Sequence, residues 1–400
     1  MLDLFQTNSC RDSGRLYFHP ACGRMSSVKK AVRFMVEFLL FGAAIFSAQA
    51  AFTSLYIFGD GVSTTTNNTS GLTNYYGNRY SNGRVWVEVL AQQQGLGANS
   101  ITNVNWSNST NNWSFYRDFS PLLVTNVNHF TAPPDAATAL FVVWVNDADF
   151  VNDMGTIYPS TNIVTWTNAI NQSLTNHWNI ITNLYYAKGA RTLIMPNAVD
   201  ITETPQYDNN PAATKSFIRQ RIVGFNTAFT ALLNQAGTSL PGITIYEPDF
   251  FSLLDNVLTN AAAYGLTNTL YNGVSIDAVT AVNYGFPSAS INGYGTNYIF
   301  WDPTDPTAKL HAVLADITQQ LISPVQISNI TSLNGSNQLV VANVPIGQNG
   351  LVLGCTNLAM PSWTTNVTFV SSNTTQTIYV TNSGPQWFYR LSFPYSWTWP

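Results

Sequence analysis

Charged residues are scarce in this sequence: they make up 9% of its 400 residues, against 45% hydrophobic and 13% aromatic residues. This scarcity excludes intrinsic disorder as the main state, because disordered chains are rich in charge and poor in aromatic side chains. A chain of this length and composition buries a large core and forms one large domain or two.

Basic residues are fewer than acidic ones, with 16 Lys and Arg against 20 Asp and Glu. Six of the 16 fall within the first fifty positions, so the rest of the chain carries a clear negative excess. A basic face that binds phosphate groups is therefore excluded, and we expect no nucleic-acid partner.

Cysteine is nearly absent, with three residues in all. Cys10 and Cys22 precede a predicted targeting segment, which leaves Cys355 alone in the mature chain. One cysteine forms no internal disulfide, and no CxxC motif or Cys/His cluster supplies the ligands of a structural zinc site. We therefore expect no structural metal and no cofactor.

Apolar runs long enough to span a membrane, about 20 residues, are also lacking. The apolar run Phe34–Phe46 follows three basic residues at positions 29–33 and precedes Ala48-Gln49-Ala50. Positive, apolar and small residues in this order predict a secretory signal peptide within residues 1–50. We expect a mature protein that starts near Ala51 and is secreted or displayed at the cell surface; the alternative is an uncleaved membrane anchor.

The mature chain predicts an α/β domain over residues 51–322. Apolar runs of strand length alternate with helical patterns, which is typical of a three-layer, doubly wound and mainly parallel sheet of flavodoxin-like type. The predicted strands are Leu55–Phe58, Ala139–Val145, Thr192–Met195 and Ile243–Tyr246, and the predicted helices are Val85–Gln94, Asn168–Ala187, Thr214–Asn234 and Pro306–Ile322. Ligands of such sheets bind beyond the carboxyl ends of the strands.

Residues 323–400 predict a small all-β module. Four short strands with turn residues between them are expected at 338–342, 350–354, 367–370 and 376–380, a spacing typical of a β-sandwich. On an exported protein, such a module suggests attachment or spacing rather than chemistry.

Four sequence blocks fall in order along the α/β domain. They are FGDGVS (Phe58–Ser63), RYSNGRVWVEVLA (Arg79–Ala91), LFVVWVNDADF (Leu140–Phe150) and FWDPTDPTAKLHAVLAD (Phe300–Asp316). Together they resemble the SGNH (GDSL) hydrolase family, whose blocks include FGDSLS, a GxND segment and FWDxxHPT. The resemblance implies the SGNH fold and hydrolysis of esters by a Ser-His-Asp arrangement.

Not every catalytic residue that the resemblance implies is present. Gly61 holds the position of the nucleophile, and Asp305 that of the base, while the orienting acid is present as Asp302. The oxyanion glycine matches Gly83. The oxyanion asparagine matches either Ala148 or, after a shift of two residues, Asn146, so that Asp149 or Asp147 follows it as the family's Asp; the sequence leaves both registers open.

Loss of the nucleophile or the base of such a triad lowers turnover by about 10^4- to 10^6-fold. Glycine has no attacking group, and a carboxylate with an ordinary pKa is a poor base for a hydroxyl. Serine-type catalysis is therefore predicted to be lost, unless Ser63 acts as a displaced nucleophile.

Aspartates gather where the family pocket lies. Asp60, Asp302 and Asp305 are expected to converge at the strand ends, with Asp147 or Asp149 nearby. Such a cluster either raises a pKa or binds a cation, so a calcium-like or sugar-hydroxyl site is one hypothesis. A carboxylate-pair hydrolase is another. The third is that these aspartates only hold turns by accepting backbone hydrogen bonds.

Three functions remain open at this point. The chain is an exported ester hydrolase that acts on acylated carbohydrates, lipids or small esters, or a non-catalytic protein that binds a glycan or an ester-bearing ligand. The third possibility is a structural surface protein in which the β-module matters and the α/β domain is a spacer. The oligomeric state is not predicted.

Overall fold

The computed structural model describes residues 52–65, 74–96, 111–333, 335–381 and 386–394. The predicted signal peptide and mature start near Ala51 lie outside these residues. All the described residues belong to one compact unit. Within the described ranges, no helix is both long and apolar enough to cross a bilayer.

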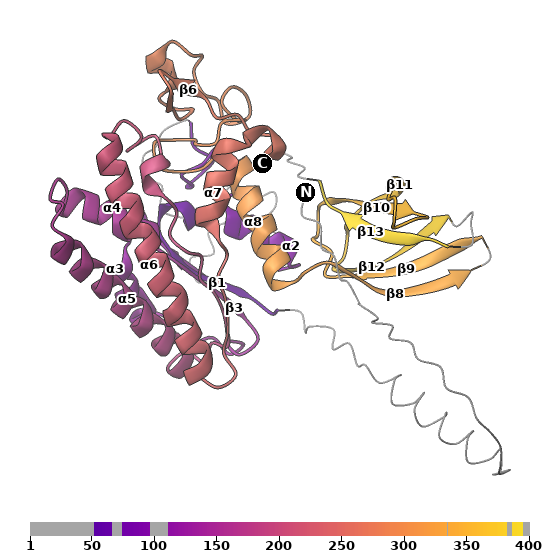
Figure 1. The fold of residues 1–400 in the computed structure, drawn as a ribbon. Coiled ribbons are helices and arrows are strands. Elements are labelled where there is room, and N and C mark those ends of the chain that lie inside the picture. Colours follow the sequence, from indigo (N-terminus) through magenta and orange to yellow (C-terminus); the bar gives the residue numbers. More distant parts are fainter. Residues whose placement is uncertain (1–51, 66–73, 97–110, 334, 382–385, 395–400) are drawn as a thin grey trace, which may run out of the picture. The chain divides into compact units, whose positions relative to one another are not determined.

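The α/β domain is built on a five-stranded parallel sheet (Figure 1). Its strand order is β2-β1-β3-β4-β5, and the neighbours pair in parallel. The strands are β1 Leu55–Gly59, β2 Asn112–Ser114, β3 Leu140–Trp144, β4 Thr192–Ile194 and β5 Thr244–Tyr246. The prediction of a doubly wound, mainly parallel sheet is confirmed.

Helices cover both faces of this sheet. The helices are α2 Trp86–Gln93, α3 Ser120–His129, α4 Asn146–Thr156, α5 Ile163–Tyr186, α6 Ala212–Ser239, α7 Phe250–Thr259 and α8 Ala308–Ile322. Alternate side chains of β1 point to opposite faces: Tyr56 and Phe58 pack with α3, α4, α5 and α6, and Leu55 and Ile57 pack with α2, α7 and α8. Two buried cores therefore enclose the sheet.

Helix boundaries differ from the prediction where capping residues decide them. Helix α5 begins at Ile163 rather than Asn168, because the side-chain oxygen of Asn162 accepts hydrogen bonds from the N–H groups of Val164 and Thr165. Helix α8 begins at Ala308 rather than Pro306, since Thr307 is its N-cap. Helices α3, α4 and α7 and strand β2 were not predicted from the sequence.

An insertion lies between α7 and α8. It contains the short turns η4 (Ala261–Tyr264) and η5 (Ala281–Tyr284) and the hairpin of β6 (Leu270–Tyr271) and β7 (Val274–Ser275). Ile276, Tyr298 and Trp301 form a small core of its own. The residues that follow it carry the last sequence block.

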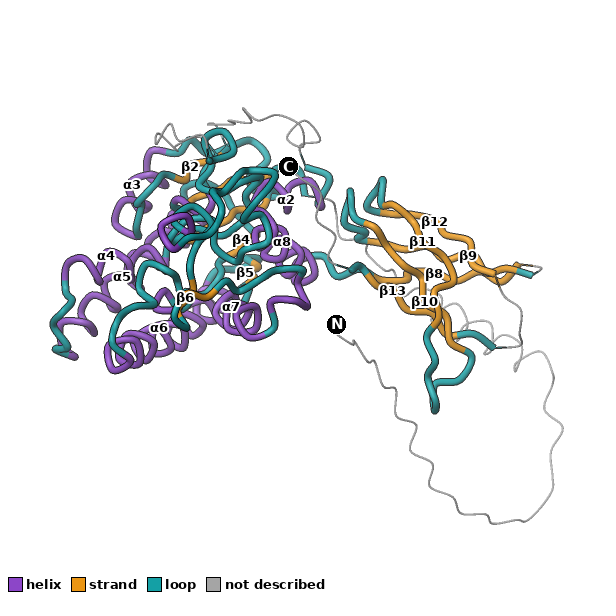
Figure 2. Tube along the Cα trace, turned by 90° about the horizontal axis from the view of Figure 1, so that it is seen from above, coloured by secondary structure: helices purple, strands orange, loops and turns teal. Residues whose placement is uncertain are grey.

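The C-terminal region is all-β, as expected (Figure 2). Two three-stranded antiparallel sheets, ordered β12-β9-β8 and β11-β10-β13, enclose a core that includes Leu339, Val341 and Val352. The strands are β8 Gln326–Leu333, β9 Ser336–Ala342, β10 Asn349–Cys355, β11 Thr364–Val370, β12 Thr375–Thr381 and β13 Phe388–Ser392. That residues 323–400 form a separate domain stays a prediction.

Asp316 of α8 is a half-buried carboxyl group with two amide donors. The side chains of Gln93 and Gln348 both donate to its Oδ1 atom, and burial raises its pKa to about 7. A carboxyl whose pKa is higher in the folded than in the unfolded chain stabilises the fold below the unfolded value. That contribution is lost as the pH rises toward the folded value.

Replacing Asp316 by asparagine should therefore flatten the pH dependence of stability. The wild-type free energy of unfolding should fall by about 3 kcal/mol between pH 5 and pH 8 through this group alone. The Asp316→Asn side chain keeps the accepting oxygen but does not ionise, so denaturant titrations of the variant should lack this part of the fall. An unchanged difference between the two pH values would show that Asp316 ionises freely in the folded protein.

Candidate active site

Gly61 lies directly opposite Asp305. It opens the 3-10 turn η1 (Gly61–Ser63) after β1, where the Asp60 carboxylate caps the turn by accepting the N–H of Val62 at 3.1 Å. A Cβ atom built on Gly61 would lie 3.5 Å from Asp305 Oδ1. The two positions that the resemblance assigns to nucleophile and base thus face each other, and one is glycine and the other a carboxylic acid.

Asp302 is held by three donors. Its Oδ1 atom accepts the N–H groups of Thr304 at 3.1 Å and Asp305 at 2.8 Å, and its Oδ2 atom accepts the hydroxyl of Tyr75 at 2.7 Å. The family's orienting acid is therefore present and fixed beside position 305.

The surroundings of Asp305 favour the protonated form of its carboxyl. Burial raises its pKa well above the usual carboxyl range, and the charge of Asp302, a hydrogen bond with the Asp302 carboxyl and the charge of Asp60 raise it further. The Thr304 hydroxyl donates to its Oδ2 atom at 3.0 Å. A protonated carboxyl donates a hydrogen bond but abstracts no proton.

Three tyrosines crowd the same place, and no sequence motif identified them. Tyr80 and Tyr116 stack with ring centroids 4.5 Å apart, and Tyr75 meets Tyr80 edge-on at 5.9 Å. The Cβ atom built on Gly61 would approach the rings of Tyr116 and Tyr80 to 3.3 and 3.6 Å. Burial, first of all, raises the pKa of Tyr80 to about 12. The rings leave little room at position 61, so even a small side chain there requires the Tyr116 ring to shift slightly.

Gly83, the predicted oxyanion glycine, is buried in a loop that is fastened to the last block. Ser81 Oγ donates to the carbonyl of Pro306 at 3.1 Å, and Asn82 Oδ1 accepts the N–H of Ala308 at 2.8 Å. These contacts bring the second and fourth sequence blocks together.

Helix α4 sends its first residues in different directions. Asn146 donates its side-chain amide to the carbonyl of Pro196 at 2.8 Å. Asp147 lines a pocket beside Val62, and burial raises its pKa to about 6. Asp149 points to other partners, the N–H of Ser120 (2.7 Å) and the hydroxyl of Ser173.

The structure therefore places Asp147 at the site and Asp149 away from it. In one register the candidate oxyanion donor is Asn146, which has one amide N–H engaged with the Pro196 carbonyl; in the other, position 148 is alanine and offers no amide.

Ser63 and the two histidines His311 and His177, which are further candidates for nucleophile or base, lie in the core. Ser63 is fully buried, and its hydroxyl accepts the indole N–H of Trp86 at 3.0 Å. His311 Nδ1 accepts the backbone N–H of Trp86, and burial lowers the pKa of His311 to about 3. His177 packs against Phe229 of α6, with its Nδ1 atom 2.8 Å from the Ser173 carbonyl oxygen. None of these hydrogen bonds and ring contacts involves Gly61.

A pocket of about 450 Å³, including its open mouth, lies beside these residues. It is bounded by η1, the start of α4, and helices α7 and α8. Its lining is mostly apolar and comprises Val62, Trp144, Asp147, Val199, Thr204, Phe250, Leu253, Leu254, Phe300, Thr304, Pro306, Leu310 and Leu314.

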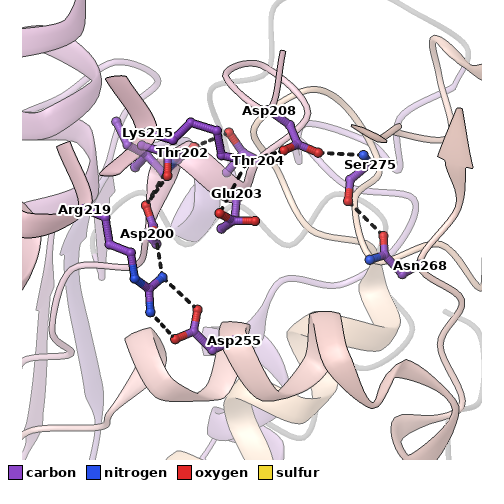
Figure 3. A network of polar contacts seen from close by, with 11 residues as sticks. Asp200, Thr202, Glu203, Thr204, Asp208, Lys215, Arg219, Asp255, Asn268 and Ser275 are labelled. Carbon is purple, nitrogen blue, oxygen red and sulfur yellow. Dashed lines mark hydrogen bonds and ion pairs between the residues drawn. The ribbon is translucent and has the colours of Figure 1, made fainter. Parts of the chain in front are cut away.

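A polar network fixes the loop that carries Thr204 (Figure 3). Arg219 of α6 bridges Asp200 and Asp255 of α7, at 2.6 and 2.5 Å. Lys215 pairs with Asp208, whose carboxylate also accepts the N–H of Ser275 at 2.6 Å. The network ties the loop after β4, helix α7 and the insertion into one wall of the pocket.

The predicted cation site is not assembled in the residues that the structure describes. They contain no group of three or more His, Cys, Asp or Glu side chains placed to hold a metal ion. The Asp60 carboxylate accepts a backbone N–H of the turn η1, and the Asp302 carboxylate accepts a backbone N–H of the last sequence block. This matches the third hypothesis for these two aspartates, which hold turns.

Two curated relatives are similar to this chain, and no family model matches it. Both are GDSL esterase/lipases of Arabidopsis thaliana, one 24% identical over 188 residues and the other 21% identical over 207. The matches cover 45% and 49% of this chain, and the chain spans about half the length of the relatives, 50% and 53%.

Among solved structures, a lipase from a goat rumen metagenome covers 68% of this chain at 9% identity and a TM-score of 0.39, over 97% of its own length. An acetylxylan esterase from Geobacillus stearothermophilus covers 68% at 11% identity and a TM-score of 0.38, over 96% of its own length. Likenesses of this degree carry no weight for function. The sheet order, the four blocks and the curated relatives together identify the α/β domain as a relative of the SGNH (GDSL) hydrolases.

Proposed function

We propose that this chain is an exported, non-catalytic relative of the SGNH hydrolases that binds a small molecule in the pocket beside Gly61. One observation carries the proposal: a Cβ atom built on residue 61 would lie 3.5 Å from Asp305 Oδ1, so the positions that the resemblance assigns to nucleophile and base face each other, and they hold a glycine and a carboxylic acid. This geometry supports the loss of serine chemistry.

The pocket supports binding over a purely structural role. A structural remnant would fill the site with side chains, whereas a space beside Val62 is unfilled and is lined by residues from five separate parts of the chain, although Gly61, Gly83 and Asp302 are not among them. Apolar clefts with a few polar groups are the usual form of small-molecule sites.

The ligand classes that the family suggests are an ester-bearing molecule or a glycan. Export rests on the N-terminal sequence alone, and N-terminal sequencing of secreted protein, with a start near Ala51 expected, checks it.

Hydrolysis of short-chain p-nitrophenyl esters tests the loss of catalysis. We expect the protein from Ala51 onward to show no turnover above the buffer rate, and a Ser63→Ala variant to behave identically, because the Ser63 hydroxyl is engaged with Trp86 inside the core. Turnover that disappears in the Ser63→Ala variant would instead establish a relocated serine nucleophile.

A further inference from the structure

The pocket contains a carboxylate with one oxygen atom that accepts no hydrogen bond from the described residues. Asp147 is 7% exposed, and its Oδ1 atom accepts no hydrogen bond within the described structure. The backbone N–H groups of Asp147 itself and of Ala148 contribute to holding the carboxyl at the start of α4. A buried carboxylate oxygen without a donor costs free energy, which a bound ligand would recover.

The other polar side chains of the pocket explain what is missing. Thr304 donates its hydroxyl to Asp305, and Thr204 donates its own to the carbonyl of Ile201. Trp144 has an unpartnered indole nitrogen, but an indole N–H is a donor without a charge. Asp147 is therefore the one pocket residue, among those the structure describes, that can carry a negative charge and still has an oxygen, Oδ1, without a donor.

The surroundings of Asp147 add negative potential and no cation. The charges of Asp147 and Asp60 repel one another. Asp149, two residues further along α4, adds another negative charge near Asp147. In the described part of the chain, the ion pairs of Arg79, Lys215 and Arg219 all go to other acids. Asp60 and Asp149, as acids, favour a positive charge in the pocket.

The walls of the pocket suit the body of an organic cation. The rings of Trp144 and Phe250 meet edge-on at 5.0 Å, and Phe300 lies in the same lining. Aromatic rings attract ammonium groups, by about 0.5–2 kcal/mol per contact. Leucines of α7 and α8 complete an apolar surface for an alkyl or aryl group.

From this arrangement we propose that the pocket binds an apolar organic amine, with its protonated nitrogen on Asp147 Oδ1 and its hydrocarbon part between α7 and α8. The inference rests on the proposed binding function and specifies its ligand class. An ester has no hydrogen-bond donor and would leave Asp147 Oδ1 unpaired, whereas a glycan hydroxyl would donate to it but bring no positive charge.

Calorimetric titration with two matched probes tests the proposal on the wild-type protein from Ala51 onward at pH 7.5. Hexylammonium and hexan-1-ol have the same chain length and differ in charge. We expect hexylammonium to bind at least tenfold more tightly than hexan-1-ol, which corresponds to about 1.4 kcal/mol. Equal affinities would overturn the proposal without the need for any variant.

Variants then locate the charge. Asp147→Asn should weaken hexylammonium at least tenfold and leave hexan-1-ol unchanged. Asp153→Asn removes a carboxyl from the same helix outside the pocket lining, and should change neither affinity. A loss with Asp153→Asn equal to that with Asp147→Asn would show a general charge effect and overturn the assignment.

Hexyl acetate distinguishes the inference from the function on which it rests. Binding of hexyl acetate and hexan-1-ol as tight as that of hexylammonium would refute the amine and keep the proposed binding site. Absence of binding by all three probes would refute both. Binding of calcium in place of hexylammonium, lost in Asp147→Asn, would identify an inorganic cation site and refute the amine.

Discussion

A double substitution, Gly61→Ser with Asp305→His, should turn this protein into an ester hydrolase. The Cβ position of residue 61 lies 3.5 Å from the Asp305 side chain, so a serine hydroxyl and an imidazole would come within hydrogen-bond reach. Asp302 is already held beside position 305. We expect turnover of p-nitrophenyl acetate to rise at least about 10^2-fold above the wild-type rate.

The single substitutions are the controls for this gain. Nucleophile and base act as a unit, so Gly61→Ser alone and Asp305→His alone should both remain near the wild-type rate. Adding Asp302→Asn to the double variant should remove most of the gain, because the carboxylate orients the imidazole. A folded double variant with no activity would mean that Gly61 and Asp305 do not occupy the catalytic positions.

The gain should stay below the activity of a complete hydrolase. Asn146 has one amide N–H engaged with the Pro196 carbonyl, and residue 148 is alanine, so at most one side-chain amide N–H there is left for an oxyanion. Loss of one oxyanion donor costs about 10^2- to 10^3-fold. The Tyr116 ring, 3.3 Å from where a Cβ atom of residue 61 would lie, also has to shift slightly for a serine.

The strands that are buried on both faces could be predicted, because such burial requires a continuous run of apolar residues. Strands β1 and β3 are unbroken apolar runs, because the helices of both layers cover them. Strand β2 has no such run: it is an edge strand of three residues. Its buried Asn112 side chain donates hydrogen bonds to the Ser63 carbonyl and the Thr65 hydroxyl. These acceptors come near Asn112 only in the folded protein.

The sequence predicted that positions 61, 302 and 305 lie close together. It did not predict the pKa shifts of the carboxyl groups or the residues that surround them. Sequence blocks located Gly61, Asp302 and Asp305, since they are fixed in order along the chain. Whether Asp147 or Asp149 enters the pocket depends on the helical phase of α4, which begins only at Asn146. The stacked Tyr80 and Tyr116 come from two different loops, so no local pattern joins them.

The second large effect concerns Arg79 and Glu88, which form an ion pair with both side chains fully buried. Two hydrogen bonds, of 2.6 and 3.2 Å, join the guanidinium to the carboxylate, and Glu88 also accepts the N–H of Val85 at the start of α2. The pair fastens the loop that carries Gly83 to that helix. Glu88→Gln should lower the free energy of unfolding by about 3 kcal/mol, because it leaves the Arg79 charge buried without a counter-charge.

Removing both charges should cost less than removing one. In Arg79→Met/Glu88→Met the buried ion pair is gone as a whole, and the losses include the acceptor of the Val85 N–H, about 1 kcal/mol. Denaturant titrations of Arg79→Met, Glu88→Met and the double variant measure this coupling directly. Glu203→Gln, in a half-exposed pair with Lys215 at 3.4 Å, should cost less than about 1 kcal/mol. If the double variant is instead less stable than Glu88→Gln, the loop depends on the charges themselves, and the family's oxyanion glycine is held in place by electrostatics rather than by packing.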